Sequence, residues 1–221
     1  MKLLAEALVK FSCGLILVGL LIFLPAGTFA YENGWLFAGL LFVPMLIAGF
    51  VMLWKSPAFL KKRLDAKEKQ GTQKGVVAFS GLMFVTGFVV AGLDFRFGWS
   101  NMPKWVVVTA SVLFLTAYGL YAEVMRENAY LSRTIKVEEG QRVVDTGLYG
   151  VVRHPMYAVT ILLFSMIPLV LGSWYALIAF AFYPAIIVIR LKDEEHLLTK
   201  ELPGYAQYKQ KVKYRLFPFI W

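Results

Sequence analysis

The chain has 221 residues, of which 59% are hydrophobic and only 17% are charged. Soluble domains carry about 25% charged residues, so this composition indicates an integral membrane protein. The net charge of +9 does not indicate a nucleic-acid partner, because the basic residues lie in short segments between apolar stretches, a pattern typical of membrane orientation.

Six apolar stretches follow one another, at residues 11–31, 35–54, 75–93, 105–122, 156–171 and 174–189. The first four have about the 20 residues that a helix needs to cross a bilayer. The last two are shorter, which predicts little tilt, local thinning of the bilayer or a partly re-entrant hairpin. We therefore predict an all-α fold, a polytopic membrane helical bundle of about six spans. We expect the first stretch to be a retained helix, because its apolar run is longer than that of a signal peptide.

Lysine and arginine are shared unevenly between the connecting segments. Seven lie in residues 55–74, five in 125–153 and six in 192–215, whereas 94–104 has two and the turn at 172–173 none. The three rich segments fall on one side of a six-span bundle. The positive-inside rule then predicts that both termini, and any site on this side, are cytoplasmic.

The chain divides into two parts without internal repeats. Residues 1–124 are expected to form N-terminal transmembrane helices. Residues 125–221 are expected to form the functional half, with a membrane hairpin at 155–190 followed by C-terminal cytoplasmic helices. After Glu195, apolar residues recur at three- and four-residue steps on both sides of Pro203-Gly204, which predicts two short amphipathic helices along the interface. The last five residues are expected to form an apolar cap.

Two polar clusters flank the predicted hairpin. The first is the run Gly147-Leu148-Tyr149-Gly150-Val151-Val152-Arg153-His154-Pro155-Met156-Tyr157, and the second is Arg190 to Glu195. The turn signal Gly172-Ser173 lies 19 residues after Arg153 and 18 before Arg190. Two helical arms of this length, each about 27 Å, return the chain to its starting depth. The sequence therefore predicts that Arg153, His154 and Tyr157 meet Arg190 and Glu194 at one mouth of the hairpin.

The residue types at this mouth suit anion and cation recognition. Pro155 fits the first turn of a helix, His154 before it should be extended, and the amides of the helix start favour an anion. Arg190 and Glu194 share one helix face. Arg190 suits a carboxylate or phosphate, whereas Glu194 and Glu195 suit an amine, ribose hydroxyls or a sulfonium.

Simpler interpretations stay open at this point. Arg153 could anchor to lipid phosphate with Tyr157 in the interface, and Arg190 with Glu194 could be a surface ion pair of little energetic value. For Glu123, Glu127 and Asn128, at the end of the fourth span, we favour helix-end solvation over a place in the same cavity. His154 and His196 have no partner ligand at metal-binding spacing, so we expect no bound metal.

Together these motifs resemble the isoprenylcysteine carboxyl methyltransferase family, and the related phospholipid N-methyltransferases look similar. The resemblance covers about residues 120–221. It rests on Thr146-Gly147-Leu148-Tyr149, on Arg153-His154-Pro155-Met156-Tyr157, and, after the hairpin, on Arg190, Glu194-Glu195, Leu198, Tyr205 and Tyr208.

The resemblance implies a membrane methyltransferase that uses S-adenosyl-L-methionine. It also implies which residues bind the cofactor: Gln141, Arg142, Val143 and Val144 as a strand-like stretch, then Tyr149, His154, Pro155, Met156, Tyr157 and Glu194. By the same resemblance Arg190 engages the substrate. A carboxylate acceptor needs only an orienting cation, which makes Arg190 the first catalytic candidate. An amine acceptor must lose a proton, which Glu195 or Tyr157 could take.

A lipophilic acceptor, an isoprenylcysteine-like carboxylate or a related isoprenoid, would enter laterally from the bilayer. The alternatives are a phospholipid headgroup N-methyltransferase, a nicotinamide-dependent sterol-type reductase with a similar C-terminal motif, and a non-catalytic membrane protein. The exact methyl acceptor and the oligomeric state stay open.

Overall fold

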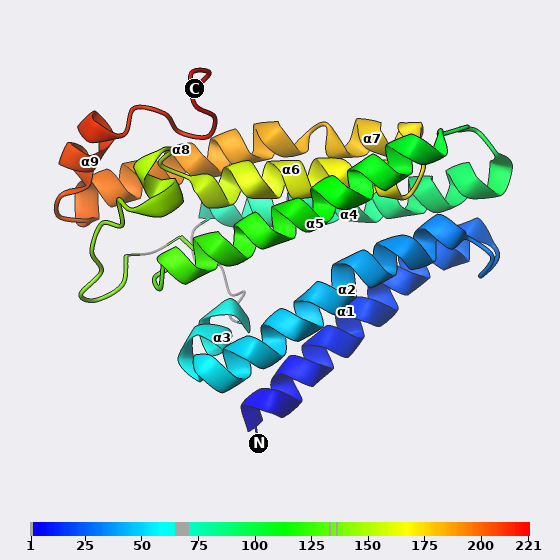
Figure 1. Ribbon diagram of the computed structural model, residues 1–221, viewed down its shortest axis with the longest axis horizontal. Helices are drawn as coiled ribbons and strands as arrows, with labels where there is room; N and C mark the ends of the chain where they lie inside the picture. The colour runs from blue at the N-terminus through cyan, green and yellow to red at the C-terminus, as the bar shows by residue number, and fades with distance from the viewer. Residues whose placement is uncertain (1, 65–70, 133, 136) are drawn as a thin grey trace.

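The computed structural model describes residues 2–64, 71–132, 134–135 and 137–221, and the regular structure in that part of the chain is helical (Figure 1). Its elements are α1 (Lys2–Ala26), α2 (Glu32–Lys55), α3 (Pro57–Leu64), α4 (Gly71–Phe97), α5 (Lys104–Glu127), a 3-10 turn η1 (Gly147–Gly150), α6 (Pro155–Val170), α7 (Trp174–Phe180), α8 (Tyr183–Glu201) and α9 (Tyr205–Lys211). Four residues that enter the predicted orientation, Lys67, Lys69, Arg133 and Lys136, lie outside the described residues.

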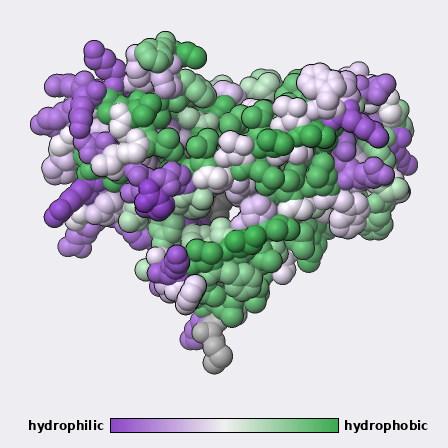
Figure 2. Space-filling model, viewed as in Figure 1, coloured by the Kyte–Doolittle hydropathy of each residue, from purple (hydrophilic) through white to green (hydrophobic). Residues whose placement is uncertain are grey.

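Five helical segments among the described residues are long and apolar enough to cross a membrane: Lys2–Ala26, Glu32–Lys55, Gln73–Phe97, Lys104–Glu127 and Trp174–Glu201. The apolar helix α6, with 16 residues, is shorter. Large apolar side chains cover the outside of the bundle, and Figure 2 shows them between more hydrophilic ends. The predicted polytopic membrane bundle is therefore confirmed.

The bundle has two ends that matter for the site. The loops after α1 and α4 and the α6–α7 turn lie at one end, which we call the turn end. Helix α3, the segments 128–132 and 137–153, and α9 lie at the opposite end, which we call the α9 end (Figure 1). Helix α1 packs on α4, and α5 packs on α6, while α2 and α3 diverge from α5 toward the α9 end.

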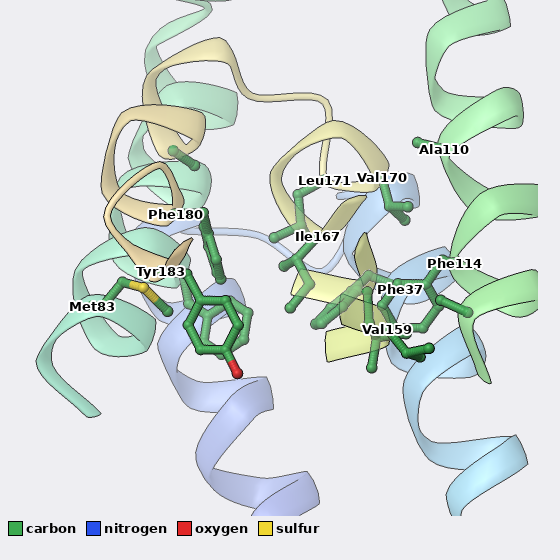
Figure 3. Close-up of a cluster of buried hydrophobic side chains, with 14 of the residues drawn as sticks. Phe37, Met83, Ala110, Phe114, Val159, Ile167, Val170, Leu171, Phe180 and Tyr183 are labelled. Carbon is green, nitrogen blue, oxygen red and sulfur yellow. The ribbon is translucent and has the colours of Figure 1, made fainter. Parts of the chain in front are cut away.

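Aromatic side chains from several helices fill the core, part of which is drawn in Figure 3. The ring of Phe84 contacts Phe164 and Phe180 edge-on, with centroids 4.9 and 5.6 Å apart. Helices α1 and α4 approach closely because Gly92 has no side chain: a Cβ there would lie 2.5 Å from the carbonyl oxygen of Ile22. Such small residues are the usual means of close helix packing in membranes.

The predicted hairpin turn is confirmed. Gly172 adopts φ +77°, a left-handed conformation that favours glycine, and the Ser173 hydroxyl caps α7 by accepting from the Ala176 amide at 3.0 Å. At this turn end the buried Asp94 accepts hydrogen bonds from the Ser100 amide and hydroxyl, both at 2.6 Å, and from the Ser173 hydroxyl. The turn is thereby fixed against α4, which sets the register of both arms.

The second arm differs from the prediction in two places. It breaks between α7 and α8, because Pro184 has no N–H to donate to the Phe180 carbonyl. Helix α8 then continues without interruption to Glu201, so the first of the two predicted short amphipathic helices is the end of α8. The predicted break at Pro203-Gly204 is present, and Gly204 adopts φ +86° before α9.

Candidate active site

A cavity opens at the α9 end, lined by residues from the segment 128–157, from α8 and from α9. Its volume, with the space open to solvent included, is about 820 Å³, and its lining combines charged, amide and aromatic side chains.

The two polar clusters meet on its wall. The Tyr157 hydroxyl on α6 donates to the Glu194 carboxylate on α8 and accepts from Arg190 Nε at 3.1 Å. Tyr157 is 3% exposed, so these hydrogen bonds are shielded from water. The predicted meeting of the hairpin ends is confirmed, because Tyr157 forms hydrogen bonds with both Glu194 and Arg190 on α8.

The start of α6 is held by the C-terminal tail. His154 precedes Pro155 at the helix start with φ −128° and ψ 62°, so it lies outside the α-helical region, as proline requires, but it is not fully extended as predicted. The backbone amides of Arg153 and His154 donate to the carbonyls of Tyr214 and Arg215, both at 2.9 Å. The tail therefore fixes the backbone of this motif. Of the last five residues, predicted to form an apolar cap, Trp221 packs against the core, whereas the side chains of Phe219 and Ile220 are exposed.

Arg153, which lines the cavity, forms a buried ion pair with Glu195, which does not. Arg153 Nε donates to Glu195 Oε1 at 2.6 Å, and Arg215 Nε donates to the other carboxylate oxygen at 3.0 Å. Arg153 also donates to the carbonyls of Val212 and Lys213, at 2.9 and 3.0 Å. The lipid-anchor interpretation of Arg153 is therefore wrong, because its guanidinium is enclosed by protein acceptors.

Three tyrosines line the cavity toward the tail. The Tyr208 hydroxyl donates to the Tyr149 carbonyl at 2.7 Å, and the Tyr149 hydroxyl accepts from Asn128 Nδ2 at 3.0 Å. Burial raises the pKa of the Tyr149, Tyr205 and Tyr208 hydroxyls above their ordinary value of 10.0. All three therefore stay protonated at neutral pH and offer hydrogen-bond donors and aromatic faces.

The segment Gln141–Val144 crosses the cavity as irregular backbone without strand partners. Gln141 accepts from the Glu138 amide at 2.8 Å, which closes the preceding turn. Lys62 on α3 pairs with the Glu138 carboxylate and ties that turn to the N-terminal half. The stretch that the resemblance implies to be strand-like is thus a loop that lines the cavity.

The next turn, at Gly147, enters η1 with φ +52°. A Cβ on Gly147 would lie 2.4 Å from the Glu127 carboxylate, which also accepts from the Thr146 hydroxyl at 3.0 Å. Glu127 is therefore a structural acceptor for this turn, whereas the exposed Glu123 pairs with Arg126 at the helix end as expected.

Ten of the predicted site residues line the cavity: Gln141, Arg142, Val143, Val144, Tyr149, His154, Met156, Tyr157, Arg190 and Glu194. Pro155 shapes the start of α6 without lining the cavity. Glu195 faces the tail rather than the cavity.

Sequence reasoning also missed several lining residues. Asn128 was interpreted as solvated, and Tyr205 and Tyr208 were placed on an interfacial helix, yet all three line the cavity. The three-residue spacing of Tyr205 and Tyr208 did indicate that both lie on one apolar face of a helix. Sequence periodicity identifies such a face but does not show which part of the protein packs against it.

Fold and site together define a polytopic helical membrane protein whose hairpin ends build a polar cavity at one end of the bundle. Residues 102–200 match the model of the isoprenylcysteine carboxyl methyltransferase (ICMT) family, which supports the resemblance found in the sequence motifs of this region. A curated relative, the uncharacterized protein YpbQ of Bacillus subtilis (strain 168), is 28% identical over 98 residues, which are 44% of this chain and 58% of that protein.

Proposed function

We propose that the protein is an S-adenosyl-L-methionine-dependent methyltransferase that esterifies the carboxylate of an isoprenylcysteine or a related isoprenoid. The observation that carries the proposal is the junction of Arg190, Tyr157 and Glu194 on the wall of a cavity within the family-matched region.

The donors and acceptors of the cavity fit this cofactor. Glu194 supplies a carboxylate for its amine or ribose hydroxyls, the start of α6 suits its carboxylate, and the faces of Tyr149 and Tyr205 suit an adenine ring or a sulfonium. When bound, the cofactor supplies an electrophilic methyl group on a sulfonium. Among the described residues no group of His, Cys, Asp and Glu gathers as metal ligands.

Arg190 is assigned to the acceptor. Its guanidinium lines the cavity and would bind the acceptor carboxylate by charge-assisted hydrogen bonds. Tyr157 holds the guanidinium from one side. A carboxylate attacks as the anion, so no protein group has to take a proton. Catalysis then depends on orientation and on exclusion of water by the apolar and aromatic lining.

A carboxylate acceptor is favoured over a phospholipid amine by the place of Glu195. An amine has to lose a proton, and Glu195, the acid considered for that step, is enclosed by Arg153 and Arg215 outside the cavity lining. We therefore assign Glu195 to positioning, because it holds the guanidinium next to His154. Tyr157, the other candidate for the amine proton, donates its own hydroxyl proton to Glu194 and would first have to lose it.

The test uses detergent-purified protein, S-adenosylmethionine with a tritiated methyl group, and N-acetyl-S-farnesylcysteine. Transfer should give a methyl ester, recognised because alkali releases its label as volatile methanol. The matched control is the same acceptor with its carboxylate converted to an amide, which should accept no label. Glu194→Ala should lose cofactor affinity in calorimetry while remaining folded.

Each alternative function has its own outcome in this assay. Alkali-stable label in phosphatidylethanolamine vesicles would support the headgroup N-methyltransferase. Thermal protection by a nicotinamide dinucleotide and not by S-adenosylmethionine would support the reductase. A folded protein that binds neither S-adenosylmethionine nor a nicotinamide dinucleotide would overturn the methyltransferase and the reductase hypotheses.

A further inference from the structure

One fully buried amide lies beside the candidate site but comes from the other half of the chain. Gln73, in the first turn of α4, has 0% of its surface exposed. It lies outside residues 102–200, the region matched by the family model. A polar side chain this deeply buried at the end of an apolar helix needs specific partners, because leaving its amide unsatisfied would be costly.

Both partners of Gln73 are on α8. Its Oε1 accepts from Arg190 Nη1 at 3.2 Å, and its Nε2 donates to Asp193 Oδ2 at 2.8 Å. Arginine can only donate and a carboxylate can only accept, so one orientation of the amide satisfies both contacts. Arg190 and Asp193 are three residues apart, on one face of the helix, and a single glutamine spans them.

This contact gives the guanidinium of Arg190 a second hydrogen bond from a neighbouring helix, and we call the two contacts the clamp. The Tyr157 hydroxyl on α6 accepts from Nε, and the Gln73 side chain on α4 accepts from Nη1. Both acceptors are neutral oxygens, so these two contacts orient the guanidinium without adding a negative charge of their own. Holding a long side chain from two directions also lowers the entropy that is lost when the acceptor is bound.

We propose that Gln73 is a positioning residue for the acceptor: it fixes Arg190 in the orientation that receives the acceptor carboxylate, and its neutral amide adds no negative charge beside the guanidinium. The proposal rests on the proposed function and extends it. The N-terminal half of the chain contributes to acceptor binding and selects for an anionic acceptor, whereas cofactor binding is left to the C-terminal half.

The test compares Gln73→Leu and Gln73→Glu with the parent protein. The probes are N-acetyl-S-farnesylcysteine as acceptor and S-adenosylmethionine binding by calorimetry. Loss of a hydrogen bond to a charged group should raise the acceptor KM about tenfold in Gln73→Leu and leave the cofactor Kd within about twofold. Gln73→Glu should raise the acceptor KM further, because a carboxylate beside Arg190 competes with the acceptor and repels Asp193.

Ser80→Ala is the control for a general disturbance of α4, because the Ser80 hydroxyl bonds only to the Val76 carbonyl of its own helix among the described contacts, at 2.8 Å. It should change neither KM nor Kd. Equal losses of cofactor and acceptor affinity in Gln73→Leu, or an unchanged acceptor KM, would overturn the positioning role. A gain in acceptor affinity in Gln73→Glu would overturn the argument from charge.

If the parent protein transfers no methyl group, the proposed function is contradicted, but the role of Gln73 can still be tested without activity. The clamp itself is then tested by melting temperatures of Gln73→Leu, Arg190→Met and the double variant. A shift in the double variant that is clearly smaller than the sum of the single shifts supports the clamp. Shifts that simply add would overturn it.

Discussion

Replacement of Glu195 by glutamine tests whether this residue holds the site together or takes part in proton transfer. The substitution keeps the size of the side chain but removes the charge that balances Arg153. Both partners of the pair are buried, with Arg153 8% and Glu195 4% exposed. Removing one member of a buried ion pair usually costs about 3–5 kcal/mol, because the other charge is left uncompensated.

The expected loss of unfolding free energy in Glu195→Gln lies at the lower end of this range. Arg153 keeps its hydrogen bonds to the Val212 and Lys213 carbonyls, and the pair with Arg215 adds little because that side chain is 31% exposed. A loss of about 3 kcal/mol corresponds to a melting temperature lower by roughly 6–12 °C for a chain of this size.

The assay is thermal unfolding of the detergent-purified protein, followed by S-adenosylmethionine binding below the transition. Glu6→Gln is the matched control: it breaks the exposed Glu6–Lys10 pair, whose side chains are 50% and 48% exposed, and should cost at most about 0.5 kcal/mol. The double variant Arg153→Met with Glu195→Leu should recover part of the stability, because no buried charge is then left alone. If Glu195→Gln melts with the parent protein and loses only turnover, the structural assignment is refuted and a catalytic role is supported.

Three further predictions follow from the packing, the tyrosines and the charge pattern. Gly92→Ala should lower the melting temperature clearly more than Gly81→Ala, where a Cβ meets nothing within 4 Å; equal shifts would contradict the close contact of α1 and α4. Since burial raises the pKa of Tyr208 above 10.0, its contribution to stability is complete below that pH and is lost as pH rises further; Tyr208→Phe should therefore lose less stability than the parent between pH 9 and 11, measured by thermal unfolding. If the α9 end is cytoplasmic, a Cys13→Ala protein carrying Lys200→Cys should react with an impermeant maleimide only in opened cells, whereas Asn101→Cys should react in intact cells; the reverse result would invert the topology.

The parts of the fold that the sequence predicted are those fixed by short-range geometry. The number and order of apolar helices follow from run length, because a lipid-exposed backbone has to satisfy its own hydrogen bonds. The meeting of the hairpin ends follows from a constant rise per residue and a turn in the middle. The break before α8 was also visible at Pro184, although the apolar run was read as one arm.

Contacts between segments that are distant in the chain leave no comparable pattern in the sequence, so they could not be predicted. Gln73 is a single amide near the start of an apolar run, and its partner Arg190 lies 117 residues away. Arg153 could be read as a lipid anchor because its acceptors, among them the Val212 carbonyl, belong to a tail without a regular repeat. Nothing in the spacing of such residues encodes the pairing, which appears only when three helices and the tail come together.

The two adjacent glutamates on α8 show that neighbouring residues of one sequence motif can have different roles. Consecutive residues on a helix point about 100° apart, so Glu194 and Glu195 cannot face the same surface. Glu194 lines the cavity and accepts from Tyr157, whereas Glu195 faces Arg153 and the tail. The pair therefore joins two tasks in one motif: one carboxylate is available to a ligand, and the other holds the backbone segment that carries His154. A chain that kept only Glu194 would keep the ligand acceptor but lose the counter-charge that keeps its neighbouring wall in place.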